Sequence, residues 1–120
     1  MISQIDLLRK RSHPVDQALV PEEIDQYLAV LDGWVLMGPH IAKTFHFSNF
    51  YQTMAFVNAI AYVAHTEDHH PEMEVSYNRC LVKFNTHSVN EGFGGLSEND
   101  FICAAKVDAV AASQYAPVSH

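Results

Sequence analysis

Four histidines lie where their side chains could share a cleft. His65, His69 and His70 fall at the end of a predicted helix, directly before Pro71, and His87 falls where a predicted strand meets a glycine-rich loop. Helix and strand ends lie at the rim of a domain, where side chains from distant parts of a chain converge. Pro71 indicates that the chain leaves helical geometry here. Because imidazole titrates near neutral pH, with a reference pKa of about 6.5, the pattern predicts general acid/base chemistry.

Other readings of these residues fit less well. His65 and His69 are one helical turn apart and His87 could be a third zinc ligand, but the acid of a His-Glu-x-x-His motif is missing beside His65. The sequence has no Gly-x-Ser-x-Gly nucleophile elbow, and both cysteines, Cys80 and Cys103, fall in apolar segments typical of buried thiols. A solvated helix end is the non-functional alternative.

The composition is that of one globular domain. Hydrophobic residues make up 48% of the 120 residues and charged residues 18%. Acidic residues outnumber basic ones by 14 to 7, and the only basic run covers residues 9–11, so no nucleic-acid partner is expected. No apolar stretch approaches the ~20 residues of a membrane span, and no signal-length apolar stretch precedes the first charges. We therefore expect no membrane partner and a cytoplasmic protein.

Hydrophobic periodicity predicts the element order α-β-β-α-β-β-α, an α+β fold in which a four-stranded antiparallel sheet has helices packed on one face. The central helix is expected to begin at a Ser48 cap and to end before Pro71. Its predicted buried stripe is Phe50, Met54, Val57, Ile60, Ala61 and Ala64. Residues 1–19 are expected to be an N-terminal arm or irregular lead-in, residues 20–115 a single domain and residues 116–120 a tail. The uncovered sheet face and edges predict a homo-oligomer.

The histidines belong to a longer ordered set of residues. His65 stands four positions before His69-His70-Pro71, and the aromatic Tyr77, His87 and Asp100 follow. The surrounding segments are Leu31-x-Gly33-Trp34, Phe47-x-Asn49-Phe50, Phe56-x-Asn58, Thr86-His87 and Gly95-Leu96-Ser97-x-x-Asp100-Phe101. From about residue 21 to residue 112, the sequence resembles the pterin-4a-carbinolamine dehydratase family.

The resemblance implies dehydration of 4a-hydroxytetrahydropterin to quinonoid dihydropterin, in recycling of the aromatic amino acid hydroxylase cofactor, with no metal or organic cofactor. It implies His69, His70 and His87 as catalytic residues, with His69 and His87 as the acid/base pair and His70 mainly holding the pterin. It also implies substrate-binding roles for Asp100, Tyr77 and His65, with Asp100 either orienting a site group or contacting the substrate. Packing in the core is an equally good reading of Tyr77. His65 stands where many members carry Glu, so the proton relay is expected to differ from theirs.

The resemblance also bears on partners. The expected partners are the pterin substrate, further copies of this chain in a homodimer or homotetramer, and an aromatic amino acid hydroxylase system. Two alternatives stay open: a non-catalytic interaction protein on the same fold, and a paralogue that acts on another pterin, related to the molybdenum cofactor.

Overall fold

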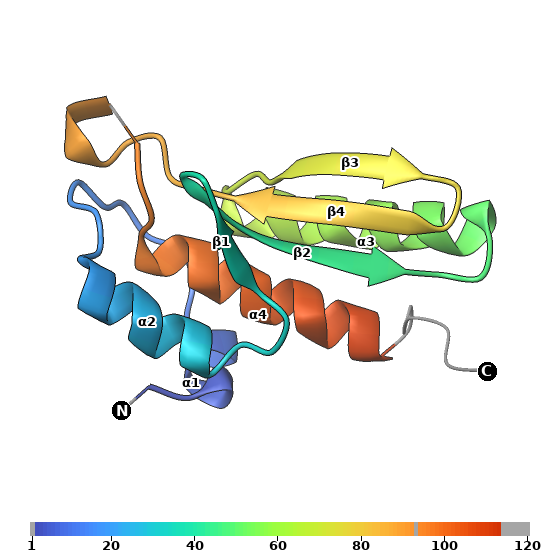
Figure 1. The fold of residues 1–120 in the computed structure, drawn as a ribbon, viewed down its shortest axis with the longest axis horizontal. Helices are drawn as coiled ribbons and strands as arrows, with labels where there is room; N and C mark the ends of the chain where they lie inside the picture. Colours follow the sequence, from blue (N-terminus) through green and yellow to red (C-terminus); the bar gives the residue numbers. More distant parts are fainter. Residues whose placement is uncertain (1, 93, 114–120) are drawn as a thin grey trace.

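The computed structural model describes residues 2–92 and 94–113, whose helices and strands follow the predicted order with one additional helix at the start (Figure 1). The elements are α1 (Gln4–Arg9), α2 (Pro21–Ala29), β1 (Val35–Met37), β2 (His40–His46), α3 (Phe50–Glu67), β3 (Glu72–Ser76), β4 (Arg79–Phe84), a 3₁₀ turn η1 (Asn90–Gly92) and α4 (Glu98–Ser113). The α+β class predicted from the sequence is confirmed. No helix in these described ranges is both long and apolar enough to cross a membrane.

The four strands form one antiparallel sheet in the order β1-β2-β4-β3. Alternate residues of the central strands point to one face and are almost completely buried, among them Ile41, Phe45, Cys80, Val82 and Phe84. Helices α3 and α4 cover this face, as predicted (Figure 1). The opposite face carries cross-strand ion pairs, including His40 Nε2 with Glu72 Oε2 at 2.8 Å. The central strands β2 and β4 therefore have one buried apolar side and one more polar side, as the sequence alternation predicts.

The prediction of an irregular lead-in over residues 1–19 is wrong for its first part. Residues 4–9 form α1, whose start is stabilised by reciprocal hydrogen bonds between Ser3 and Asp6. Leu7 is fully buried in the main core, and α1 lies against α4. The connection between α1 and α2, residues 10–20, contains no regular element. The predicted tail, residues 116–120, lies outside the described residues.

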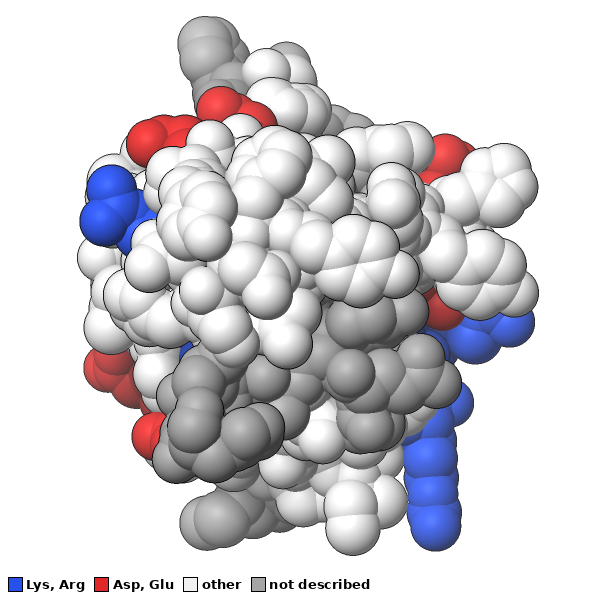
Figure 2. All heavy atoms as spheres, turned by 90° about the vertical axis from the view of Figure 1, so that its right-hand side faces the viewer, with Lys and Arg blue, Asp and Glu red and all other residues white. Residues whose placement is uncertain are grey.

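The buried side of α3 differs from the predicted stripe. The helix is capped by Asn49 rather than Ser48, because the Asn49 side chain accepts a hydrogen bond from the Gln52 N–H at 2.9 Å. The buried residues are Thr53, Phe56, Ile60, Val63, Ala64 and Glu67. Phe50 is instead half exposed, at the end of the molecule that also presents Tyr51 and Tyr77. Figure 2 shows this end, where uncharged side chains fill much of the surface and charged ones lie towards the margin.

Candidate active site

The end of α3 directs His69 toward α4. The helix stops at Glu67, and Asp68 takes a left-handed conformation with φ 50° and ψ 44°. The His69 N–H then bonds back to the Ala64 carbonyl at 3.2 Å, which closes the turn. Pro71 follows two residues later, so the helix cannot continue. This turn separates the two adjacent histidines: His69 is largely covered and His70 is exposed.

His69 forms a hydrogen bond with Asp100. Its Nε2 lies 2.6 Å from Asp100 Oδ1, and its ring stacks nearly parallel on Phe84, with ring centroids 5.9 Å apart. The side chain of His69 is 12% exposed and that of Asp100 is 0% exposed. An ionised carboxylate only accepts hydrogen bonds, so Nε2 carries the proton shared with Asp100. The other ring nitrogen, Nδ1, is then the one that can exchange a proton with a ligand.

Asp100 is itself fixed by a buried hydrogen-bond network. Its Oδ2 accepts from Thr86 Oγ1 and from the Ser97 N–H, both at 2.8 Å. Ser97 Oγ lies 2.7 Å from Thr86 Oγ1 and accepts from the Asn99 N–H at 3.2 Å, at the start of α4. The resemblance implies that Asp100 orients a site group or contacts the substrate, and its carboxylate is fully buried behind His69. Within this chain the Asp100 carboxylate contacts His69, Thr86 and Ser97.

A polar cavity of about 250 Å³ adjoins His69. It is lined by Ser12, His13, Pro14, Val15, Glu67, Asp68, His69, Thr86, Ser88 and Asn99. A larger cavity of about 360 Å³ is lined by residues of β2 and the later half of α4, where Lys43 and Asp108 pair with each other at 2.9 Å. The cavity of about 250 Å³ is the candidate active site, because its lining includes His69, whose imidazole is held in place by Asp100.

The pattern of the pterin 4 alpha carbinolamine dehydratase family matches residues 17–110. The chain belongs to the pterin-4a-carbinolamine dehydratase family. A Bdellovibrio bacteriovorus protein named for this family is 75% identical over 120 residues, which cover the whole of both chains. A Nitrosospira multiformis protein with the same family name is 54% identical over 106 residues, 86% of this chain and 90% of the relative.

Solved structures show the same fold. A Brucella melitensis structure described as a transcriptional coactivator/pterin dehydratase superposes with a TM-score of 0.72 at 35% identity, over 79% of this chain and 99% of that one. A pterin dehydratase-like protein, described as a RuBisCO assembly factor in the alpha-carboxysome, has a TM-score of 0.54 at 26% identity, over 68% of this chain and 89% of that one. The family fold therefore carries more than one described role.

Two other histidines of the dehydratase pattern lie at the same end of the sheet as His69. Glu72 pairs with Lys83, so His70, just before β3, and His87, just after β4, emerge together at that end. Both are exposed, as is His65 one helical turn before His69. In the described residues no three His, Cys, Asp or Glu side chains converge as metal ligands do.

The structure does not bring Tyr77 to this cavity. Tyr77 follows β3 at its far end, where its carbonyl accepts a hydrogen bond from Thr53 Oγ1 at 3.0 Å and its side chain is 63% exposed. The five residues of β3 span roughly 17 Å at about 3.3 Å per residue. The substrate-binding role predicted for Tyr77 is therefore not supported within one chain. The Ser76–Arg79 pair closes the β3–β4 turn and thereby places Tyr77 at this end of the sheet.

Sequence reasoning missed Glu67 and Asn99, which are buried beside the cavity. Burial by itself raises the pKa of Glu67, but the Ser12 N–H, Lys106 and Arg11 outweigh it and hold the pKa below its usual value. Neither residue stands out in an amphipathic pattern, because a buried polar side chain looks like a surface one. The only available signal was the position of each, within two residues of His69 or Asp100.

Proposed function

We propose that this protein catalyses the dehydration of a 4a-hydroxytetrahydropterin to the quinonoid dihydropterin and water. The proposal rests on one observation above all: His69 lines a polar cavity and is held through Nε2 by a buried carboxylate. Membership of the pterin-4a-carbinolamine dehydratase family supports the same substrate class.

The reaction requires two proton transfers. The C4a–O bond breaks and the leaving hydroxide takes a proton to become water, while N5–H gives its proton to a base and a C4a=N5 double bond forms. Neutral imidazole can accept the N5 proton and imidazolium can protonate the leaving oxygen, so two histidines suffice. Each positioned proton transfer contributes roughly 10²–10⁴-fold in rate.

We assign the acid/base pair to His69 and His87 and the holding of the pterin mainly to His70. Since Asp100 occupies Nε2 of His69, the exchanged proton passes through Nδ1. The exposure of His70 and His87 at the same sheet end is compatible with contact to a bound ring. We also assign His65, which is exposed near the end of α3, a contact with the substrate.

The wider cellular role is also proposed. Recycling of the cofactor of an aromatic amino acid hydroxylase, in the cytoplasm, fits the product of this reaction. Self-association into a homodimer or homotetramer is supported by β1, an edge strand whose residues Val35, Leu36 and Met37 are about half exposed.

The test follows the ultraviolet absorbance of freshly generated 4a-hydroxytetrahydropterin with the native protein, His69→Ala and His46→Ala. His46 is exposed at the opposite end of the sheet and serves as the matched control. We expect the native protein and His46→Ala to accelerate the spontaneous reaction equally, and His69→Ala to lose at least about 100-fold of that acceleration. No acceleration by the native protein would refute the proposal and favour an interaction role or another pterin substrate.

A further inference from the structure

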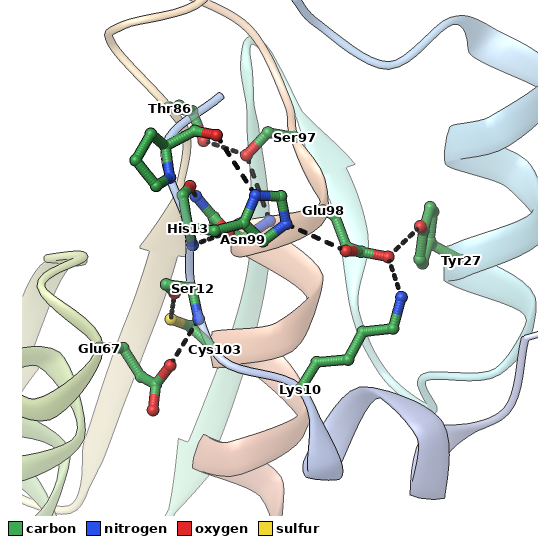
Figure 3. A network of polar contacts seen from close by, with 11 residues as sticks. Lys10, Ser12, His13, Tyr27, Glu67, Thr86, Ser97, Glu98, Asn99 and Cys103 are labelled. Carbon is green, nitrogen blue, oxygen red and sulfur yellow. Dashed lines mark hydrogen bonds and ion pairs between the residues drawn. The ribbon is translucent and has the colours of Figure 1, made fainter. Parts of the chain in front are cut away.

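The cavity beside His69 has a second wall that the family pattern does not contain. The family match begins at residue 17, whereas Ser12, His13, Pro14 and Val15 line the cavity. These residues belong to the α1–α2 connection, residues 10–20, which crosses the junction between the end of α3 and the start of α4. Figure 3 shows Ser12 and His13 of this connection beside Glu67 and Asn99.

Three attachments of the connection lie within two residues of a proposed site group. The Ser12 N–H donates to Glu67 Oε1 at 2.8 Å, and Glu67 stands two residues before His69. The Ser88 hydroxyl donates to the Val15 carbonyl at 3.2 Å, and Ser88 follows His87.

The third attachment is a two-way amide clamp. The His13 N–H donates to Asn99 Oδ1 at 3.1 Å, and Asn99 Nδ2 donates to the His13 carbonyl at 2.7 Å. Asn99 is buried and immediately precedes Asp100. The backbone of the connection is thereby fixed to the same turn of α4 that carries the carboxylate holding His69.

Ion pairs and close packing also hold the α1–α2 connection against the cavity. Glu67 pairs with Arg11 Nε at 3.1 Å. Glu98 pairs with Lys10 Nζ at 2.7 Å and with His13 Nε2 at 3.3 Å (Figure 3). A Cβ on Gly95 would stand 3.1 Å from the Ala18 Cβ, so the lack of a side chain at Gly95 lets the connection pack closely there. Pro14 and Val15 then give the polar cavity an apolar side, which suits the flat face of a heteroaromatic ring.

We propose that residues 12–15 form a substrate-binding wall of the cavity, in which Val15 is a specificity-determining contact and Asn99 is the positioning residue that holds the wall. This rests on the proposed function, because the ligand is taken to be the pterin. The wall limits the space beside His69, so the size of the side chain at position 15 controls how well the ring is bound.

The first test changes the wall without removing α1, whose Leu7 belongs to the core. Val15→Trp is compared with Ile5→Trp, a matched control at an exposed position of the same N-terminal region. We expect Val15→Trp to raise KM for the 4a-hydroxytetrahydropterin at least about tenfold, since the cavity is filled, with kcat within about threefold of the native value. Ile5→Trp should leave both unchanged.

The second test does not depend on activity. Asn99→Leu removes both hydrogen bonds of the clamp, and the rate of diethylpyrocarbonate modification of each histidine is followed by mass spectrometry. We expect modification of His69 to accelerate several-fold while exposed His65 reacts at its native rate. Near-ultraviolet circular dichroism of Trp34 reports whether the fold is retained.

The outcomes separate the two proposals. If the native protein lacks dehydratase activity but the clamp variant exposes His69, the proposed function fails and the wall stands as part of the cavity. If the native protein is active, yet Val15→Trp has native KM and Asn99→Leu leaves His69 protected, the wall proposal is overturned. A rise in KM equal in Ile5→Trp and Val15→Trp would also overturn it.

Discussion

Replacing Asp100 by Asn tests the role of the buried carboxylate in a shape-conserving way. At present Oδ1 faces His69 Nε2, while Oδ2 accepts from Thr86 Oγ1 and the Ser97 N–H. In Asp100→Asn the amide oxygen is best placed on the two donors, which leaves the amide NH₂ facing His69. His69 Nε2 must then accept a hydrogen bond, so the ring proton moves to Nδ1. In the neutral ring Nδ1 then carries the proton, so it cannot accept one from the substrate.

The size of the effect follows from the hydrogen bond that is lost. A hydrogen bond to a charged group contributes about 1.5–3 kcal/mol. If the reaction uses this bond in the transition state, kcat falls about 10–150-fold, since about 1.36 kcal/mol corresponds to a factor of ten. The amide still satisfies Thr86 and Ser97, so the free energy of unfolding should fall by no more than about 1–3 kcal/mol. A protein of ordinary stability, about 5–15 kcal/mol, stays folded.

The assay is steady-state dehydration of 4a-hydroxytetrahydropterin, combined with urea unfolding of each variant. Asp108→Asn is the matched control, because Asp108 is a partly buried acid on the same helix that accepts from Trp34 Nε1 at 3.0 Å and from Lys43 Nζ at 2.9 Å. It lies about 12 Å further along α4 at about 1.5 Å per residue. Asp108→Asn should lose stability and keep kcat. A folded Asp100→Asn protein with kcat within twofold of native would refute the role assigned to Asp100.

Three further predictions follow from burial and charge. His87→Ala should lower kcat at least about 100-fold and change the free energy of unfolding by less than about 0.5 kcal/mol in urea titrations, because His87 is exposed; a native rate would contradict its role. Burial raises the pKa of Cys80 to about 11 and that of Cys103 to about 12, so both should react slowly with a thiol reagent at pH 8 until the protein is unfolded; fast reaction of the folded protein would contradict their burial. Burial tends to raise the pKa of Glu98, but hydrogen bonds from Lys10, Tyr27 and His13 lower it overall. The ionised Glu98 therefore stabilises the fold above its unfolded pKa, about 4.3, and this stabilisation is lost as pH falls through the lower folded pKa. Glu98→Gln should make the free energy of unfolding depend less on pH in the acid range. An unchanged pH dependence of the free energy of unfolding would count against this ion pair.

The sheet could be predicted because its strands alternate between apolar and polar residues, and Ile41, Phe45, Val82 and Phe84 are indeed buried. The six-residue helix α1 could not, because it is too short to show a period and has Leu7 as its only buried residue. Such a helix depends on tertiary packing rather than on its own sequence.

The stripe of α3 was wrong for a related reason. Thr53 and Glu67 are buried because partners distant in sequence satisfy them, Thr53 through the Tyr77 carbonyl and Glu67 through the Ser12 N–H. Periodicity treats both as surface residues, so the predicted face was rotated.

The site was predicted as a set of residues but not as a geometry. His69 and Asp100 were both identified, yet whether Asp100 faces a substrate or a histidine depends on the loop between β4 and α4. That loop is closed by two backbone hydrogen bonds between Thr86 and Gly95, which bring the start of α4 against His69. Tyr77 was placed in the site by its position in the pattern, whereas the β3–β4 register carries it to the opposite end of the sheet.

We propose that His69, held by the buried carboxylate of Asp100, acts with His87 to dehydrate the pterin without a metal. The most direct measurement is the dehydration rate of 4a-hydroxytetrahydropterin by the chelator-treated native protein beside chelator-treated His69→Ala. We expect full acceleration by the native protein after chelation and a loss of at least about 100-fold in His69→Ala. Acceleration that disappears with the chelator and returns with added metal, or that survives unchanged in His69→Ala, would contradict it.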